Sequence, residues 1–216
     1  MLAETLARGD SDGFDIALRR RGEVIELIVN GIFAMDSAEV ASEVALADLV
    51  DESATSVLVG GLGLGFTAAR LLDRTAARLT VVELSADLIA WARAGLTPEL
   101  ARVAGDARVT LVQDDIARHL PDAPVVDAVL LDVDNGPDFL IHDQNADLYA
   151  GPALAVASGR VAPGGVLAVW SEGYSSDLDE ALRSLGGTTG SVVVPVQRGD
   201  RRIDYAIHTW RPRGVG

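Results

Sequence analysis

Residues Ser56–Thr67 read SVLVGGLGLGFT, an apolar run that breaks into glycines and then continues as an apparent helix over 66–72. The apolar run is typical of a buried β-strand. Gly61, Gly63 and Gly65 allow the backbone to turn sharply and to approach a ligand closely. The N-terminus of the helix behind them offers free N–H groups. This stretch therefore predicts the binding loop of a nucleotide-type cofactor.

A second buried strand is predicted at Leu79–Glu83, and it ends in a carboxylate. Glu83 follows Gly65 by 18 residues. In dinucleotide-binding folds an acidic residue at this place grips the hydroxyl groups of a ribose. Together, the glycine loop (Gly61–Gly65) and Glu83 predict a site for an adenosyl group.

Composition limits the class of protein. The chain has 216 residues, 49% of them hydrophobic, and a formal net charge of −14. This charge argues against a nucleic acid as partner, because phosphate contacts need concentrated Lys and Arg, and it is compatible with a cationic small-molecule substrate. No cysteine is present, which excludes disulfides and thiolate metal sites. His119, His142 and His208 show no metal-ligand spacing, so we expect no metal.

The lengths of the apolar runs and the N-terminal segment predict no membrane partner. No run of 18 or more uncharged apolar residues occurs, whereas a membrane-spanning helix needs about 20. The segment Met1–Asp12 contains acidic residues and lacks a secretory apolar core. We therefore expect a cytoplasmic protein.

The pattern of apolar runs and polar turns divides the chain into two parts. Phe14–Arg20 and Val24–Asn30 flank a polar turn and predict a β-hairpin, followed by Gly31–Met35. We assign residues 1–36 to a small N-terminal β-hairpin lobe and residues 37–216 to a cofactor-binding domain. Asp36 or Ser37 is expected to cap the helix that opens this domain.

The cofactor-binding domain alternates strands and helices, which predicts an α/β, Rossmann-like fold with a mostly parallel sheet and helices on both faces. Two final apolar runs flank a polar turn and predict a C-terminal antiparallel hairpin. The predicted seven strands are 56–60, 79–83, 108–112, 126–131, 165–170, 191–196 and 203–210, and the predicted helices are 66–73, 86–94, 115–120 and 145–160.

Acidic residues recur where the parallel strands end, which is where ligands bind in such sheets. Asp115 is ambiguous, because it also begins the segment over 116–120 and can serve as its N-cap. Asp132 interrupts a buried apolar run, and a pair of carboxylates near a cofactor can bind an amine and accept its proton. The acids at successive strand ends are Glu83, Asp114 and Asp115, Asp132 and Asp134, and Glu172.

Two other kinds of nucleotide-binding site also contain a glycine-rich loop. Residues Gly63–Ala68 satisfy the loosened G-x-G-x-x-A pattern of nicotinamide-dependent enzymes. The acids after the third and fourth strands have no part in that fingerprint. A phosphate loop of the nucleotide triphosphatase type is disfavoured, because no Lys-Ser or Lys-Thr follows the glycines.

The order of these motifs resembles the class I S-adenosylmethionine-dependent methyltransferase fold and, more narrowly, the spermidine synthase family. The similarity covers most of the chain. It implies that the glycine loop holds the amino-acid side of the donor, Glu83 its ribose and Asp115, next to Asp114, its adenine. Asp132 would then lie beside the sulfonium and the attacking amine, with Asp134 as second choice for the base. The motifs are Gly61–Gly65, Glu83, Asp114–Asp115, Asp132–Asn135 and Pro163–Gly165.

The chain departs from this family where polyamines would bind. The family's Asp-Ser-Ser-Asp loop is here Asp132–Asn135, and the Tyr and His of its Tyr-His-Glu motif are Ala41 and Ser42. Trp170 stands where the family has a glutamine. It would serve either as an aromatic or cation–π wall of the site or as a core residue. Asn135, Tyr149 and Trp170 are the predicted substrate contacts.

Three functions therefore stay open. The first is S-adenosylmethionine-dependent methyl transfer to a small molecule, which we favour at this point because the polyamine-binding positions are altered. The second is aminopropyl transfer from decarboxylated S-adenosylmethionine, which Asp132 and the negative charge support. The third is a non-catalytic adenosyl-binding protein. A homodimer through the N-terminal hairpin and the apolar first helix is expected, because members of the resembled family often form one.

Overall fold

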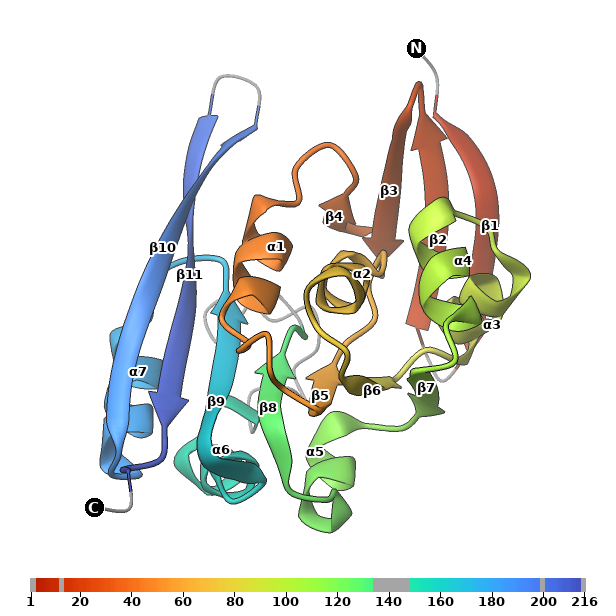
Figure 1. The fold of residues 1–216 in the computed structure, drawn as a ribbon. Coiled ribbons are helices and arrows are strands. Elements are labelled where there is room, and N and C mark those ends of the chain that lie inside the picture. The colour runs from red at the N-terminus through yellow and green to blue at the C-terminus, as the bar shows by residue number, and fades with distance from the viewer. Residues whose placement is uncertain (1–2, 12–13, 134–147, 199–200, 215–216) are drawn as a thin grey trace.

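The computed structural model describes residues 3–11, 14–133, 148–198 and 201–214. These residues form a small antiparallel sheet and a large, mostly parallel one (Figure 1). The large sheet has seven strands in the order β10-β11-β9-β8-β5-β6-β7. The α/β fold class, the mostly parallel sheet and its C-terminal hairpin are therefore as predicted.

The small sheet is more extensive than the predicted hairpin. It has four strands in sequential order, each antiparallel to the next. The additional first strand was missed because its sequence, ETLARGDS, is largely polar and does not alternate. In Figure 1 this sheet lies beside α3 and α4. Its strands are β1 (Glu4–Ser11), β2 (Phe14–Arg21), β3 (Val24–Val29) and β4 (Ile32–Asp36).

The strand order of the large sheet reverses next to β5. From β5 the chain adds β6 and then β7 on one side, and it returns to place β8 and β9 on the other. Such a reversal opens a crevice at the carboxyl ends of the two strands, where ligands of this architecture bind. The strands are β5 (Ser56–Gly60), β6 (Arg78–Glu83), β7 (Val109–Gln113), β8 (Val126–Leu131), β9 (Val161–Ser171), β10 (Thr188–Arg198) and β11 (Arg201–Arg211).

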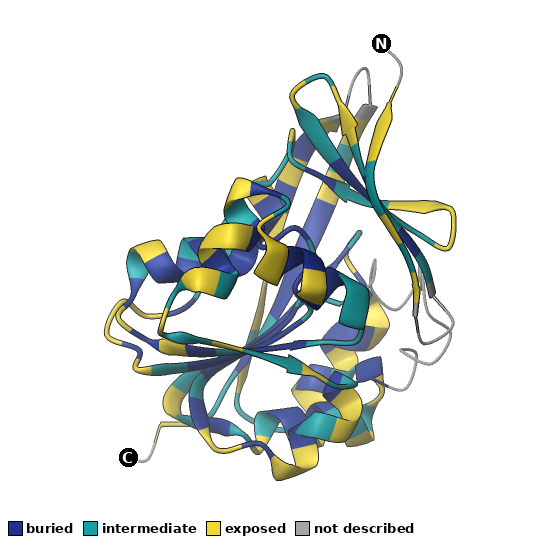
Figure 2. Ribbon diagram, turned by 90° about the vertical axis from the view of Figure 1, so that its right-hand side faces the viewer, coloured by how far each residue is buried: buried dark blue, intermediate teal, exposed yellow. Residues whose placement is uncertain are grey.

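Helices cover both faces of the large sheet, and the buried strands lie between them (Figure 2). Helices α1 to α4 pack in one apolar cluster, which also includes part of the small sheet, and α5 to α7 pack in the other. Within the described residues no helix is both long and apolar enough to cross a membrane. The helices are α1 (Ala41–Asp48), α2 (Phe66–Arg74), α3 (Ala86–Ala94), α4 (Pro98–Gly105), α5 (Ile116–His119), η1 (Leu120–Asp122), α6 (Gly151–Ser158) and α7 (Ser176–Ser184).

The predicted start of the first helix was wrong. Helix α1 begins after Val40, which gives it no side-chain cap. Asp36 instead accepts hydrogen bonds from the N–H groups of Ala38 and Glu39, at 3.0 and 3.2 Å, and so makes a turn before the helix. The helix predicted over 145–160 begins at Gly151 with a proline in its first turn, a place that proline favours. Residues 145–147 lie outside the described part.

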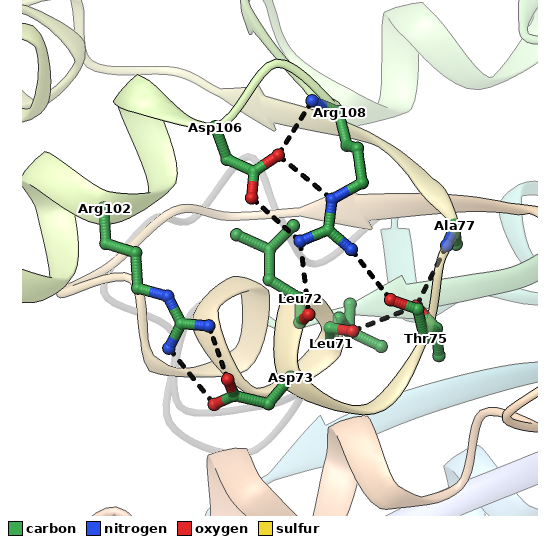
Figure 3. Close-up of polar contacts among 8 residues, drawn as sticks. All are labelled: Leu71, Leu72, Asp73, Thr75, Ala77, Arg102, Asp106 and Arg108. Atoms are coloured by element: carbon green, nitrogen blue, oxygen red, sulfur yellow. Dashed lines mark hydrogen bonds and ion pairs between the residues drawn. The ribbon is translucent and has the colours of Figure 1, made fainter.

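Arg108 ties the end of α2 to the start of β7 (Figure 3). Its guanidinium donates to the main-chain carbonyls of Thr75 and Leu72, at 2.8 and 3.2 Å, so it satisfies acceptors at the C-terminus of that helix. Asp106 accepts from the same guanidinium, and this hydrogen bond lowers the pKa of Asp106 to about 2. The second pair in Figure 3, Arg102 with Asp73, joins α4 to α2. The helix behind the glycine loop is thus anchored at its far end.

Candidate active site

A cavity of about 200 Å³ lies at the carboxyl ends of β5, β6 and β8, beneath the small sheet. It coincides with the reversal of strand order. Its polar wall contains most of the predicted site residues together with several that the sequence analysis did not select. The residues with polar groups or sulfur that line it are Met35, Ser42, Glu43, Thr67, Glu83, Ser85, Asp114, Asp115, Asp132, Trp170 and Tyr205, and Gly61 and Gly63 line it with their backbone.

The glycine loop needs its glycines for two reasons. Gly61 has φ +95°, and a Cβ there would lie 2.2 Å from the carbonyl oxygen of Asp132. No L side chain fits both that conformation and that contact. Gly63, at φ +52°, lines the cavity, whereas Gly65 lies behind it as the residue before α2. The loop therefore runs against the end of β8, and the Asp132 N–H donates to the carbonyl of Gly60 at 2.8 Å.

Glu83 holds two loops in place at the edge of the cavity. One carboxylate oxygen accepts from the Leu62 N–H at 2.9 Å, and the other accepts from the Ser85 N–H at 2.8 Å. Burial raises the pKa of Glu83, although these backbone hydrogen bonds oppose the rise. The N–H groups of Gly63 and Leu84 also act on this carboxylate, so Glu83 organises the loop while it lines the cavity. Its place is consistent with the predicted ribose contact.

Asp114 and Asp115 line the far end of the cavity, after β7. Asp115 accepts from the Ala117 N–H at 2.8 Å and is the N-cap of α5. Asp114 accepts from the Asp115 N–H at 2.8 Å. The capping interpretation of Asp115 and the cavity interpretation are thus compatible, and its adenine contact stays a prediction.

Asp132 has the electrostatic setting of a general base. Burial of its carboxylate, with a contribution from the negative charge of Glu43, raises the pKa of Asp132 to about 7. Thr67 opposes this, because its hydroxyl donates to Asp132 Oδ2 at 2.6 Å and so favours the charged form. A carboxylate with a pKa near the working pH can both accept and release a proton.

Thr67→Val is expected to raise the pKa of Asp132 and so to shift the pH dependence of activity. Valine keeps the shape of threonine but removes the hydroxyl that stabilises the Asp132 carboxylate, so the pKa of Asp132 rises further. In a rate-against-pH profile the rising limb should shift to higher pH by about one unit, with most of the activity regained above it. Thr67→Ser, which retains the hydroxyl, is the control. An unshifted profile for the valine variant would contradict the role of this hydrogen bond.

Glu43 is one of the site residues that were not predicted from the sequence. It lies in the first turn of α1, is 8% exposed and lines the cavity. Ser42 donates its hydroxyl to Glu43 Oε2 at 2.7 Å. A signal was present in the sequence, because Glu43 occupies the Glu position of the Tyr-His-Glu motif of the resembled family, next to the two altered residues Ala41 and Ser42. We refer to Asp132 and Glu43 as the acid pair.

Trp170 combines both roles that were considered for it. It is 9% exposed and belongs to the core, and it also lines the cavity. Tyr205 on β11, which was not predicted, lies beside it with ring centroids 5.0 Å apart and planes tilted by 45°. The indole N–H of Trp170 has no acceptor among the described residues. The two rings form an aromatic wall of the cavity.

The structure does not bring Tyr149 to the cavity. Tyr149 is 6% exposed in the core cluster on the other face of the sheet, and its hydroxyl donates to the carbonyl of Val133 at 2.5 Å. It therefore holds the segment that follows Asp132. A direct substrate contact was predicted for Tyr149, but the order of residues in the sequence does not reveal on which side of the sheet a ring lies. Asp134 and Asn135 lie outside the described residues.

The chain has an α/β fold of the class I methyltransferase-like type, with a cavity at the carboxyl ends of its parallel strands. Comparison with known proteins shows which members of this fold it is similar to. The chain is 30% identical over 168 residues to a polyamine aminopropyltransferase of Corynebacterium efficiens, a match that covers 74% of this chain and 31% of that protein. The chain thus spans about a third of the length of this curated relative. The chain is therefore similar in sequence to a polyamine aminopropyltransferase, and it shares its fold with the spermidine synthases described below. No family model matches it.

Solved structures agree on the fold. A spermidine synthase in complex with the transition-state analogue AdoDATO superimposes with a TM-score of 0.77 at 16% identity, over 95% of this chain and 73% of that one. The spermidine synthase of Thermotoga maritima gives a TM-score of 0.73 at 15% identity, over 95% and 72% of the two chains. A precorrin-6y C5,15-methyltransferase of Geobacter metallireducens gives 0.55 at 18% identity, over 79% and 86%.

Proposed function

We propose that the chain is an aminopropyltransferase of the spermidine synthase type, which transfers the aminopropyl group of decarboxylated S-adenosylmethionine to a small amine. The observation that carries this proposal is the acid pair in the wall of the cavity, next to the glycine loop. The similarity to a polyamine aminopropyltransferase supports it. Methyl transfer, which the altered polyamine positions favoured, has less support.

The glycine loop itself argues for a donor without a carboxylate. Intact S-adenosylmethionine carries a carboxylate that needs hydrogen-bond donors, and the loop amides were the expected ones. In the structure four of these amides already donate to groups of the protein. Their acceptors are the Val82 carbonyl for Gly61, Glu83 Oε2 for Leu62, Met35 Sδ for Leu64 and the Leu62 carbonyl for Gly65, at 2.8, 2.9, 3.3 and 2.9 Å.

The negative charges that line the cavity also favour a donor without a carboxylate. A donor carboxylate in this cavity would face Glu43 and, above the pKa of Asp132 at about 7, a second negative charge. Repulsion of this kind is a common way to reject a near-identical ligand. The sulfonium and the amino group of the decarboxylated donor are positive, so the same charges attract them. We therefore assign the donor to the glycine loop, Glu83 and the acids after β7, with its positive end towards the acid pair.

The chemistry then requires few protein groups. The donor supplies a carbon already activated by its bond to a sulfonium. The acceptor amine must lose a proton to become a nucleophile, and we assign this proton to Asp132, whose pKa of about 7 suits a general base. A nitrogen–carbon bond forms, the carbon–sulfur bond breaks, its electron pair stays on sulfur as a neutral thioether, and the proton resides on Asp132. Alignment of the reactants and exclusion of water from the cavity supply much of the remaining rate.

Product analysis tests this proposal. The protein is incubated with a short diamine and either decarboxylated or intact S-adenosylmethionine, and the products are separated by mass spectrometry. We expect methylthioadenosine and an aminopropylated amine from the decarboxylated donor alone. Formation of S-adenosylhomocysteine and a methylated acceptor from the intact donor would replace the proposal by methyl transfer. Binding of either donor without any product, over a panel of amines, would favour the non-catalytic adenosyl-binding protein.

A further inference from the structure

Met35 of β4 brings the small sheet into contact with the glycine loop. The Leu64 N–H donates to the Met35 sulfur at 3.3 Å. A Cβ added at Gly63 would lie 2.7 Å from the same sulfur, so the thioether rests directly on the Gly63 backbone. Met35 also lines the cavity, as Glu43 and Ser42 do. Met35 is therefore part of the surface that the donor meets.

The hydrogen bond to Met35 differs in kind from the others in the loop. Gly61, Leu62 and Gly65 donate to groups that hold the loop in shape, namely two main-chain carbonyls and the Glu83 carboxylate. Leu64 donates to a thioether, which is a weak acceptor, on a flexible side chain with three rotatable bonds. Of these four amides, Leu64 is thus the one that a ligand carboxylate could take without unmaking the loop. It can do so only if Met35 moves away.

We propose that Met35 is a donor-specificity residue. It fills the space above Gly63 and occupies the Leu64 N–H, so that a donor without a carboxylate binds with Met35 in place, while intact S-adenosylmethionine must displace it. This inference rests on the proposed function and adds to it a residue that excludes the carboxylate by occupancy, in addition to the acid pair that repels it by charge.

Truncation of Met35 separates occupancy from charge. Met35→Ala frees the Leu64 N–H and opens space beside it, whereas Met35→Leu retains most of the volume. Glu43→Gln removes one negative charge and leaves Met35 in place. Because the truncation can weaken packing between the small sheet and the loop, Met35→Val serves as a milder variant that suits a β-strand. Thermal unfolding of each variant reports on that packing.

The measurement is calorimetric titration of the wild type and these variants with decarboxylated and with intact S-adenosylmethionine. The readout is the ratio of the two dissociation constants within one protein, because damage to packing weakens both donors alike. In the wild type we expect the decarboxylated donor to bind more tightly. Met35→Ala should reduce this preference by about tenfold, the size expected for a hydrogen bond to a charged group. Met35→Val should give an intermediate ratio and Met35→Leu one close to the wild type.

The outcomes distinguish the two proposals. An unchanged ratio in Met35→Ala and Met35→Val, with a wild type that prefers the decarboxylated donor, would overturn the role of Met35 and leave the proposed function standing. A ratio that changes in Glu43→Gln alone would assign the selectivity to charge and would also overturn it. A wild type that prefers intact S-adenosylmethionine, or that binds neither donor, would overturn the proposed function and this inference together.

Discussion

Asp132→Asn is expected to reduce kcat by about 10²- to 10⁴-fold, the usual contribution of a general base, while the donor dissociation constant changes by less than about tenfold. Asparagine can still accept the hydrogen bond that Thr67 donates to Asp132, so the shape of the site is retained and only the proton acceptor is lost. Steady-state kinetics and calorimetry measure the two quantities. Asp122→Asn, at an exposed acid in η1, is the matched control. Unchanged turnover in Asp132→Asn would remove Asp132 from the mechanism.

The same substitution should stabilise the protein, and the effect depends on pH. The pKa of Asp132 is raised from 3.8 to about 7 in the folded state. Between these values the folded state binds more protons than the unfolded state, so stability falls as pH rises from about 4 to about 7 and stays lower above it. Asparagine does not titrate. At pH 8 the variant should be more stable by on the order of 4 kcal/mol and near pH 4 by little. Chemical denaturation at the two pH values tests this.

In the wild type, kcat/KM should depend on the ionisation of Asp132. Asp132 accepts a proton only when it is ionised, so kcat/KM should rise with pH through about 7. This rising limb should be absent from the residual activity of Asp132→Asn. A limb that persists in the variant would belong to another group.

Glu83→Gln is expected to weaken donor binding by about 100-fold or more and to lower the unfolding temperature. The two oxygens of Glu83 accept the N–H groups of Leu62 and Ser85, and the N–H groups of Leu84 and Gly63 also act on them. A glutamine has one oxygen, so its NH₂ group would face a backbone N–H, and a buried donor left without an acceptor costs about 1–3 kcal/mol. The glycine loop would lose its support, and the donor ribose would lose its predicted acceptor.

Calorimetry with the decarboxylated donor and thermal unfolding measure both effects, and Glu23→Gln, at an exposed position of the small sheet's β2–β3 turn, is the control. A lower unfolding temperature with unchanged donor affinity would show that Glu83 serves the loop alone. Unchanged values of both would contradict the role given to its hydrogen bonds.

Some of the elements that were missed had local signals. Helix α4 begins after Thr97, whose hydroxyl accepts from the Leu100 N–H at 3.2 Å, and it has a proline in its first turn. Helix α7 begins after Ser175, which caps it in the same way. A cap followed by proline or by apolar residues at helical spacing predicts a helix start. Strand β1 had no such signal, because pairing with β2 rather than its own pattern places it in a sheet.

The sequence by itself determined the succession of strands and helices along the chain, the mostly parallel sheet, the glycine loop and the acids that follow the strands. These are local properties, because apolar runs, glycines and capping residues act on neighbouring backbone. Only the tertiary structure decided that Glu43 meets Asp132, that Met35 rests on the glycine loop, that Tyr205 stands beside Trp170, and that Tyr149 faces the opposite side of the sheet. These residues come from elements far apart in the chain. Their proximity and the burial that raises the pKa of Asp132 exist only once the small sheet and the helices have packed around the cavity.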